Sequence, residues 1–391
     1  MASCKVTARV LRYAHVSLEL NQAVLKAGWK YDDYRRHEPW RTHMISFTSV
    51  LYHPGDGKVY CGLTSFSGKI FYRFDPETKK FEDLHFERIG DIYDAKIHRS
   101  LELDDDGTIV GATAYLIDFA DHPDAPGGKV FRYDPKTDEL KVIDVPVPHD
   151  GIQSIALDRR RQIVYGNCYP LGHKFQFDLR TKETKPFKWI NAHKVRCDDE
   201  GSFWGLTDPD EDGAPWPYIT DEQAKIMETL WNIRSKLPKL YKYNPEEGFV
   251  VFPQGFPPFS GKPQSIANMV DGDDGYVYFG TNFGALYRAD KRTGELEYSG
   301  LPNVGGRLEG MAFGKDGLLY LGGGSFYQTR LSVYDRESGK FTDLGPIYDP
   351  EKGKICIIVH DLTVTDDGVV YVGETDNAER SGYLWECEVK L

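Results

Sequence analysis

One pattern of apolar and polar positions recurs seven times along the chain. A short apolar strand runs into an acidic or glycine-containing turn, and a second apolar strand follows and ends at glycine or another small residue. In six repeats a further hairpin follows, marked by an aromatic residue before Asp-Pro or a related pair. The seven turns are Asp56-Gly57, Asp106-Gly107, Arg160-Arg161, Glu200-Gly201, Asp274-Gly275, Asp316-Gly317 and Asp367-Gly368.

A repeat of about four strands that recurs every forty to fifty residues is typical of a β-propeller. The number of turns fits seven blades better than six or eight. The sequence therefore predicts an all-β fold, a seven-bladed β-propeller, in a single domain that covers residues 1–391. In such a ring the first strand of every repeat lies at the central axis, so residues far apart in sequence meet at one pocket.

The first and last repeats define the predicted blade and the closure of the ring. Strands of the first repeat are predicted at Ile45–His53, Lys58–Gly62, Ile70–Asp75 and Lys80–Leu84. The seventh repeat has three strands, at Ile357–Thr365, Val369–Gly373 and Tyr383–Lys390. We expect Val6–Val16 to supply its missing strand, because pairing the two ends of the chain removes open sheet edges.

One segment departs from the strand pattern. A capping box at Thr220–Gln223 precedes apolar residues at helical spacing, which predicts a helical insertion in blade four at about 214–238. The insertion explains the long spacing of that repeat. Its helix either packs on the rim or serves as a lid over the axis.

A ring of polar residues is predicted where the first strands begin. Counting back eight residues from the third position of each turn gives Ser49, Arg99, Gln153, His193, Ala267, Glu309 and His360. The positions two residues further along are all apolar: Leu51, Leu101, Ile155, Val195, Met269, Met311 and Leu362. We expect the side chains of this apolar ring to belong to the hydrophobic core. The polar ring predicts a functional pocket, because neutral amides alone would serve a passive water-filled channel.

Further candidate residues come from loops expected at the same end of the ring. Two loops, at 31–41 and 167–173, combine cations with aromatic rings that suit a small anionic sugar. The candidates next to the polar ring or in these loops are His98, Tyr169, His173, Arg35, Trp40 and Arg41. Alternatively, the loop at 31–41 is a solvent-exposed connector that does not bind a ligand.

Charge and composition exclude several classes of function. The net charge is −12, with 60 acidic against 48 basic residues, which argues against a nucleic-acid partner. No apolar run is long enough for a signal peptide or a membrane span, so we expect no membrane partner and a cytoplasmic protein, or a secreted one if a leader was trimmed. The six cysteines are scattered singly, which favours buried, reduced thiols.

The residue types around the axis leave open whether the protein binds a metal ion. Two or three histidines with Gln or Glu around an axis could hold a divalent ion such as Ca²⁺, Mn²⁺ or Zn²⁺, but no ligand set is defined. Asp208–Gly213 has the opening of a calcium loop, yet Ile219 stands where a bidentate Glu belongs. No P-loop and no dinucleotide fingerprint is present, so no nucleotide cofactor is predicted.

Three motifs carry a family resemblance: Lys96-Ile-His-Arg99, Asn167-Cys-Tyr-Pro-Leu-Gly-His173 and Leu321-Gly-Gly-Gly-Ser-Phe-Tyr327. With the predicted ring, the chain resembles the propeller-fold polysaccharide lyases, which include ulvan lyases, oligogalacturonate lyases and lyases acting on rhamnosyl-glucuronate ends. The resemblance implies cleavage of a glycosidic bond next to a uronic acid by β-elimination, on a small anionic saccharide. It also implies His193 or His360 as base, Tyr169 as acid or as shared acid and base, and Arg99 as carboxylate clamp. The substrate-binding residues would then be His98, Gln153, His173, Glu309, Arg35, Arg41 and Trp40.

Three alternatives stay open. Gluconolactonase-like propellers, which are metal-dependent hydrolases, share a Glu-Gly pair near the axis, here Glu309-Gly310. Streptogramin lyases share the ring and the Asp-Gly-x-x-aromatic turn, but their His-Gly-Ile motif is absent. A non-enzymatic propeller that binds a ligand or a protein is the third, although the pairs typical of WD repeats are absent.

Overall fold

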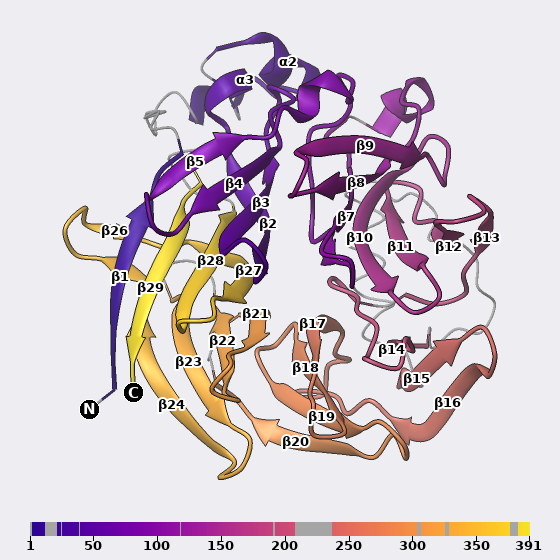
Figure 1. The fold of residues 1–391 in the computed structure, drawn as a ribbon, viewed down its shortest axis with the longest axis vertical. Helices are drawn as coiled ribbons and strands as arrows, with labels where there is room; N and C mark the ends of the chain where they lie inside the picture. Colours follow the sequence, from indigo (N-terminus) through magenta and orange to yellow (C-terminus); the bar gives the residue numbers. More distant parts are fainter. Residues whose placement is uncertain are drawn as a thin grey trace.

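The computed structural model describes residues 2–11, 22–24, 26–38, 40–117, 119–190, 192–207, 237–302, 306–324, 328–375 and 382–391. In this part of the chain, seven antiparallel sheets are arranged around one axis, and the first strand of each sheet lies innermost (Figure 1). The prediction of an all-β, seven-bladed propeller is confirmed. The calcium-loop motif and the predicted helical insertion lie almost entirely outside the described residues.

The first three blades each contain four strands in chain order. Blade one is β2(Ser46–His53), β3(Lys58–Thr64), β4(Phe71–Asp75) and β5(Lys80–Asp83), close to the predicted strands. Blade two is β6(Leu101–Leu103), β7(Ile109–Ala112), β8(Val130–Asp134) and β9(Glu139–Asp144). Blade three is β10(Gly151–Asp158), β11(Ile163–Tyr169), β12(Lys174–Asp178) and β13(Thr184–Pro186).

The next three blades follow the same order, with one exception. Blade four is β14(Phe203–Leu206), β15(Lys239–Asn244) and β16(Gly248–Gly255). Its innermost segment forms only an isolated bridge, between Cys197 and Phe203. Blade five is β17(Ile266–Asp271), β18(Tyr276–Thr281), β19(Leu286–Asp290) and β20(Leu296–Gly300), and blade six is β21(Leu308–Phe313), β22(Leu319–Gly323), β23(Arg330–Asp335) and β24(Lys340–Pro346). A small hairpin, β25(Tyr348–Asp349) and β26(Lys354–Ile355), leads to the last blade.

The seventh blade closes the ring with a strand from the other end of the chain. Its order is β27(Ile358–Val364), β28(Val369–Thr375), β29(Leu384–Lys390) and β1(Ser3–Arg9). β1 pairs antiparallel with β29 over seven residues, from Ser3 opposite Lys390 to Arg9 opposite Leu384, and the two strands lie side by side in Figure 1. The predicted closure is confirmed, although the strand begins and ends earlier than the predicted Val6–Val16.

The acidic turns explain why the repeat is visible in the sequence. In blade five, the Asp274 carboxylate accepts a hydrogen bond from the Tyr278 hydroxyl at 2.6 Å, and Gly275 has a φ of +85°, which favours glycine. The same Tyr-to-Asp bond spans four residues at Asp56 in blade one and at Asp316 in blade six. In these three blades the acidic turn thus ties the two strands that it joins.

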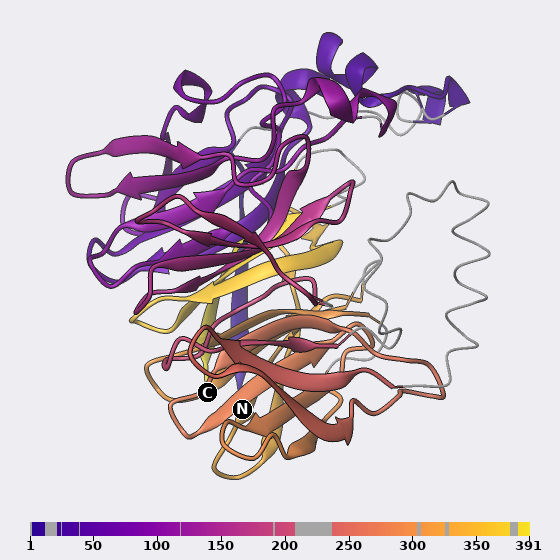
Figure 2. The same ribbon diagram turned by 90° about the vertical axis from the view of Figure 1, so that its right-hand side faces the viewer.

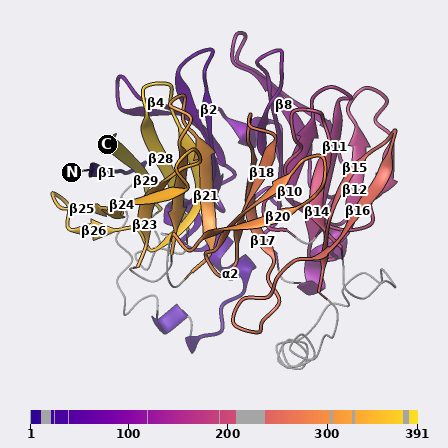
Figure 3. The same cartoon turned by 90° about the horizontal axis from the view of Figure 1, so that it is seen from below.

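The core sits between and inside the blades. Of the predicted apolar ring, Leu101, Ile155, Val195, Met269, Met311 and Leu362 are all buried, and Leu51 packs partly buried against the core. The few described helices are short: α2(Tyr31–Arg36), α3(Trp40–His43), η1(Phe86–Arg88) and η2(Phe119–Asp124). Figures 2 and 3 show that α2 lies beyond one end of the blades, where the chain enters blade one.

Candidate functional site

A cavity of about 800 Å³ opens at one end of the axis. It is lined by the starts of first strands and by loops that join second to third strands, the two kinds of segment predicted to share this end. Seven predicted site residues line it: His98, Arg99, Gln153, Tyr169, His193, Glu309 and His360. The structure therefore brings together residues from five different blades around the axis.

The lining of this cavity is predominantly cationic. It includes Lys96, Arg99 and Arg307, whereas Glu309 is the one carboxylate among the described lining residues. The surface of the whole protein is acidic, with a net charge of −12. A cationic recess in an acidic molecule favours a small anionic ligand over a cationic one.

Arg99 and Glu309 form an ion pair at the floor of the cavity. Their side chains are 4% and 2% exposed, and the Arg99 guanidinium donates to Glu309 Oε2 and, at 3.2 Å, to His98 Nε2. Burial alone would raise the pKa of Glu309, but Arg99 and the adjacent imidazoles hold it well below its usual range. Glu309 is therefore ionised at neutral pH.

The backbone and the guanidinium of Arg99 are both unusual. Arg99 has a φ of +50°, in the left-handed region that non-glycine residues rarely adopt. Its Nε is buried without a hydrogen-bond partner. Strained backbone and unsatisfied buried donors are found more often at functional sites than elsewhere, and Arg99 combines both at the floor of the cavity.

His193 is held against the ionised carboxylate. Its Nδ1 lies 3.5 Å from Glu309 Oε1, and Arg307 Nη1 lies 3.2 Å from the same Nδ1 and 3.1 Å from Oε1. Desolvation lowers the pKa of His193, and Arg99 and Arg307 act in the same direction, although Glu309 opposes them. The imidazole is thus neutral at pH 7. A guanidinium can only donate, so the Arg307 contact requires a lone pair on Nδ1 and places the proton on Nε2. In the other tautomer Nδ1–H is directed at Glu309, and Nε2 then carries the lone pair that can accept a proton.

His98 and His360 pack edge to face, with ring centroids 4.6 Å apart. Each Nδ1 lies within 3 Å of a backbone carbonyl, that of Gln153 for His98 and that of Thr48 for His360, so each Nδ1–H is the donor. Burial, with Lys96 and Arg99 adding to it, lowers the pKa of both rings well below 6.5. Both are therefore neutral, with Nε2 directed away from these carbonyls.

Arg307 is a charged lining residue that the sequence analysis did not single out. Its side chain is 54% exposed, and it lines the cavity beside His193 and Glu309. Arg307 immediately precedes β21, and a register shift between Leu308 and Gly310 interrupts the alternation of the strand at this point. Spacing from Glu309 therefore did not predict that Arg307 lines the cavity.

Four predicted substrate-binding residues do not line the cavity. Trp40 is 1% exposed and packs with Val24, Trp29 and Tyr34, so its indole is unavailable for stacking on a sugar. Arg41 pairs with Glu38 at 2.8 Å on the surface. The structure places neither residue in the cavity, because α3 turns its aromatic face into the small helical cluster and its charged face to solvent, and their role in substrate binding stays a prediction.

The other two residues lie near the cavity but have other partners. Arg35 pairs with Asp32 at 2.6 Å and donates to the carbonyl of Leu116, a lining residue, so it braces the wall. His173 Nδ1 lies 3.0 Å from the buried Asp150 carboxylate. Tyr31 lines the cavity in place of its neighbours on α2.

A second buried ion pair lies in the ring directly below the site. Lys194 Nζ donates to Asp361 Oδ1, with both side chains at most 3% exposed, and Asp361 Oδ2 accepts from the Val50 amide at 3.0 Å. Burial lowers the pKa of Lys194, although Asp361 opposes this effect. Neither residue lines the cavity, so this pair is structural support for the polar ring above it.

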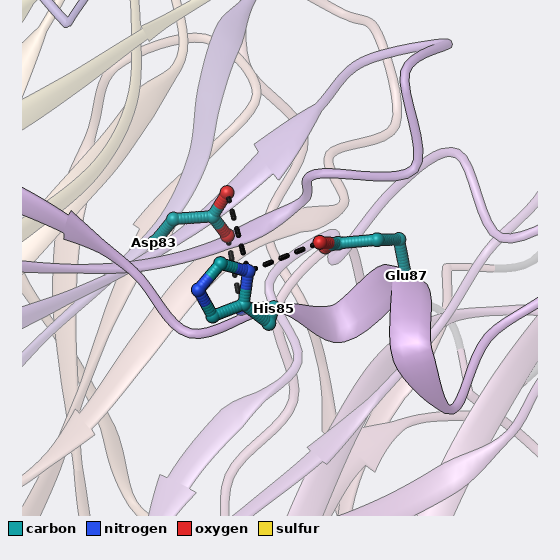
Figure 4. A group of neighbouring side chains, drawn as sticks. All are labelled: Asp83, His85 and Glu87. Carbon is teal, nitrogen blue, oxygen red and sulfur yellow. Dashed lines mark hydrogen bonds and ion pairs between the residues drawn. The ribbon is translucent and has the colours of Figure 1, made fainter.

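Within the described part of the chain, no group of three His, Cys, Asp or Glu side chains gathers at the axis as metal ligands would. Over the described residues, one group alone places three ligating atoms within 4.8 Å of one another: Asp83, His85 and Glu87 (Figure 4). This group lies at the end of β5, the outermost strand of blade one, and one of its carboxylates pairs with Lys69 at 2.7 Å. It is a surface cluster, remote from the axial histidines.

Comparisons with known proteins identify the fold and nothing more specific. No family model matches the chain, and no curated protein matches it. Among the helices in the described ranges, none is long and apolar enough to cross a membrane.

Solved structures that are similar to the chain are propellers of varied function. The extracellular domain of a putative hybrid two-component system from B. thetaiotaomicron is 14% identical, with a TM-score of 0.57 over 88% of this chain, which spans 38% of the length of that protein. Virginiamycin B lyase from Staphylococcus aureus is 11% identical, with a TM-score of 0.55 over 86% of this chain and 93% of its own. The WD40 repeats of RRP9 are 10% identical, with a TM-score of 0.54 over 89% and 96%. The group includes sensor, enzyme and WD40 propellers, so fold alone leaves the activity undetermined.

Proposed function

We propose that this propeller is a carbon–oxygen lyase that cleaves a small uronic-acid-containing saccharide by β-elimination. The observation that carries the proposal is the arrangement of His193, Glu309 and Arg307 in a cation-lined cavity. A neutral imidazole, an ionised carboxylate that orients it and a half-exposed guanidinium supply what proton abstraction next to a carboxylate requires.

In this mechanism His193 is the base. Glu309 accepts from Nδ1–H once Arg307 has left Nδ1 for the substrate carboxylate, and in that tautomer Nε2 is free to remove the α-proton beside this carboxylate. As the imidazolium forms, the buried negative charge of Glu309 stabilises it. Arg99 keeps that carboxylate ionised and in place, and is a positioning residue rather than the substrate clamp.

Arg307 neutralises the substrate carboxylate. An α-proton next to an ionised carboxylate is very weakly acidic, and a guanidinium paired with that carboxylate stabilises the enolate that forms. Arg307 is more than half exposed, whereas Arg99 is committed to Glu309 and His98. Tyr169, also half exposed at the cavity, is placed to protonate the leaving oxygen.

A ligand-binding propeller without chemistry is the second candidate. The buried Arg99–Glu309 ion pair favours this candidate, because the two charges already neutralise each other at the floor of the cavity. A lactonase that depends on a metal has less support, since the axial residues in the described ranges do not gather three ligating atoms. The similarity to extracellular sensor domains and to a lyase is compatible with either of the first two functions.

The test is to follow the ultraviolet absorbance of an unsaturated uronate while the protein is incubated with a panel of uronic-acid saccharides. We expect the absorbance to rise with at least one saccharide, and we expect the same rise when a chelator is present. Binding detected by calorimetry without any absorbance change would support the ligand-binding propeller and overturn the lyase. Lack of both would overturn the two candidates together.

A further inference from the structure

Two cysteines meet where the ring is closed. Cys4 lies in β1 opposite Val389, and Cys387 lies in β29 opposite Val6. Paired residues of neighbouring strands share a face of the sheet, and so do residues two positions apart on one strand. Cys4 and Cys387 are therefore diagonal neighbours on one face, and both belong to the apolar cluster that packs the seventh blade. Diagonal neighbours are about 7–8 Å apart between their Cα atoms, at the limit of what a disulfide can bridge, so the bond requires a small shift of β1 along β29.

The two thiols differ in exposure and in acidity. Cys4 is partly exposed on β1, the outermost strand of its sheet, whereas Cys387 is fully buried. The neighbouring Cys387 thiol lowers the pKa of Cys4, and the same contact raises the pKa of Cys387. A partly exposed thiol with a lowered pKa beside a buried one is the arrangement of an attacking and a resolving cysteine.

We propose that Cys4 and Cys387 form a reversible disulfide when the protein meets a hydroperoxide, and that this bond locks the closure of the propeller. This goes beyond the proposed lyase activity and does not depend on it. The pair is a modification site in the last blade, on β1 and β29, the two strands that hold the ends of the chain together.

The reaction balances with hydrogen peroxide as the oxidant. The Cys4 thiolate attacks one peroxide oxygen, the O–O bond breaks, and Cys4 sulfenic acid forms with release of water after one proton is taken up. The Cys387 thiol then attacks the Cys4 sulfur, the S–S bond forms, and a second water leaves. Two thiols are oxidised by two electrons, and one peroxide is reduced to two waters.

The bond would act on a junction that is otherwise held by noncovalent contacts. Arg9 donates to Glu386 at 2.7 Å, and the Ala8 amide donates to Asp349 at 2.9 Å, in addition to the strand pairing. A cross-link between Cys4 and Cys387 encloses almost the whole chain, and the entropy that a disulfide removes from the unfolded state grows with loop length. Oxidation should therefore prevent β1 from separating from β29.

The third cysteine of the same cluster does not compete. Cys356 is fully buried, so a solvent oxidant reaches Cys4 first. Nor do the three sulfurs form a metal site, because within the described residues they do not lie within 4.8 Å of one another.

The experiment treats the full-length reduced protein with a few equivalents of hydrogen peroxide, followed by alkylation in denaturant and peptide mass mapping. We expect a Cys4–Cys387 linked peptide, a loss of two alkylation sites, and a rise in Tm of about 5 °C that dithiothreitol reverses. Cys4→Ser and Cys387→Ser should each abolish the linked peptide and the rise in Tm. Cys197→Ser, which removes another partly exposed thiol, should keep both.

Three results would overturn the proposal. One is oxidation of Cys4 to sulfenic or sulfinic acid without a link to Cys387. Another is a linked peptide that joins Cys356 to either residue instead. The last is a Cys4–Cys387 link that leaves Tm unchanged, because the bond would then not lock the closure. If the serine variants fail to fold, mapping of the wild-type protein still decides between these results.

Discussion

The Arg99 guanidinium donates to the Glu309 carboxylate at a point where both side chains are almost fully buried. The two residues are 210 positions apart and start from opposite halves of the ring. Through this contact, blade two fixes the carboxylate that orients His193. The pair thus links blades two and six to the geometry of the proposed base.

Removing one partner of this pair should destabilise the fold more than removing both. Glu309→Leu leaves Arg99 buried and unpaired, which should lower the free energy of unfolding by about 3–5 kcal/mol. The double variant Arg99→Met with Glu309→Leu should recover most of that loss but remain inactive, because His193 loses its orienting carboxylate. Urea unfolding of the wild type, the two single variants Arg99→Met and Glu309→Leu, and the double variant measures the coupling energy between the two side chains. Additive losses would show that the two charges do not depend on each other.

Replacing His193 should reduce turnover with little effect on folding. His193→Gln removes the proposed base and should lower kcat by about 10²–10⁴-fold. The matched control is His85→Gln, because His85 also contacts a carboxylate, Glu87, at 3.1 Å but lies outside the cavity. Steady-state kinetics of the two variants is the measurement. Equal, small losses in both would remove His193 from the mechanism.

Arg307 should determine recognition of the substrate carboxylate. A guanidinium can bind a carboxylate through two parallel hydrogen bonds and an ammonium cannot, so Arg307→Lys should raise KM and lower kcat, with a loss in kcat/KM of about 10–100-fold. Arg330→Lys is the control, because Arg330 is similarly exposed and pairs with Asp343 away from the cavity. A substrate analogue with an amide in place of the carboxylate should bind the wild type and the Arg307 variant equally weakly. If the Arg307 variant still bound the carboxylate substrate more tightly than the amide analogue, as the wild type should, Arg307 would not be the residue that recognises the carboxylate.

The effect of replacing Tyr169 on the cleavage rate should increase with the basicity of the leaving group. Tyr169→Phe removes the proposed proton donor and should slow cleavage of an unactivated sugar linkage by about 10²-fold or more. A substrate with an aryl leaving group needs no protonation, so its rate should be nearly unchanged. Uniform slowing of both substrates would indicate a binding role for the ring of Tyr169 instead.

The repeat pattern was sufficient to predict the fold, because each blade carries its own local signals. The Asp-Gly turns, with a tyrosine four residues after the Asp, mark hairpins that depend on contacts within one repeat. The alternation of polar and apolar positions near the axis also follows from one register common to all blades. Hence the axial positions of Gln153, His193 and His360 could be predicted without any three-dimensional information.

Local context outside the repeat could not be predicted in the same way. Trp40 lies in a short helix whose burial depends on Trp29 and Tyr34, and no periodicity specifies that contact. The role of Arg99 depends on Glu309 in a distant blade, so the sequence predicts a cation at the axis but not that it is already neutralised. Arg307 was missed because it precedes the aligned position by two residues.

Acid should destabilise the protein before its carboxylates titrate. The pKa values of His98 and His360 are lowered well below 6.5 by burial, so the unfolded chain binds more protons than the native state once the pH falls below about 6.5. The free energy of unfolding should therefore decrease as pH falls, by about 1.4 kcal/mol per histidine for each pH unit below that value. Stability from Glu309, whose pKa is held low, is present above about 4.5 and is lost only at lower pH.

Urea unfolding at pH 7.5, 6.5, 5.5 and 5.0 measures this dependence. Asp271, at the opposite end of the axis, acts in the opposite sense over part of the window, because burial raises its pKa to about 6 and its native form keeps a proton. The decisive comparison is therefore the His360→Gln variant, which should show a shallower loss of stability between pH 6.5 and 5.0 than the wild type. Identical slopes in the two proteins would mean that His360 binds protons equally in the native and the unfolded state, so that burial does not lower its pKa.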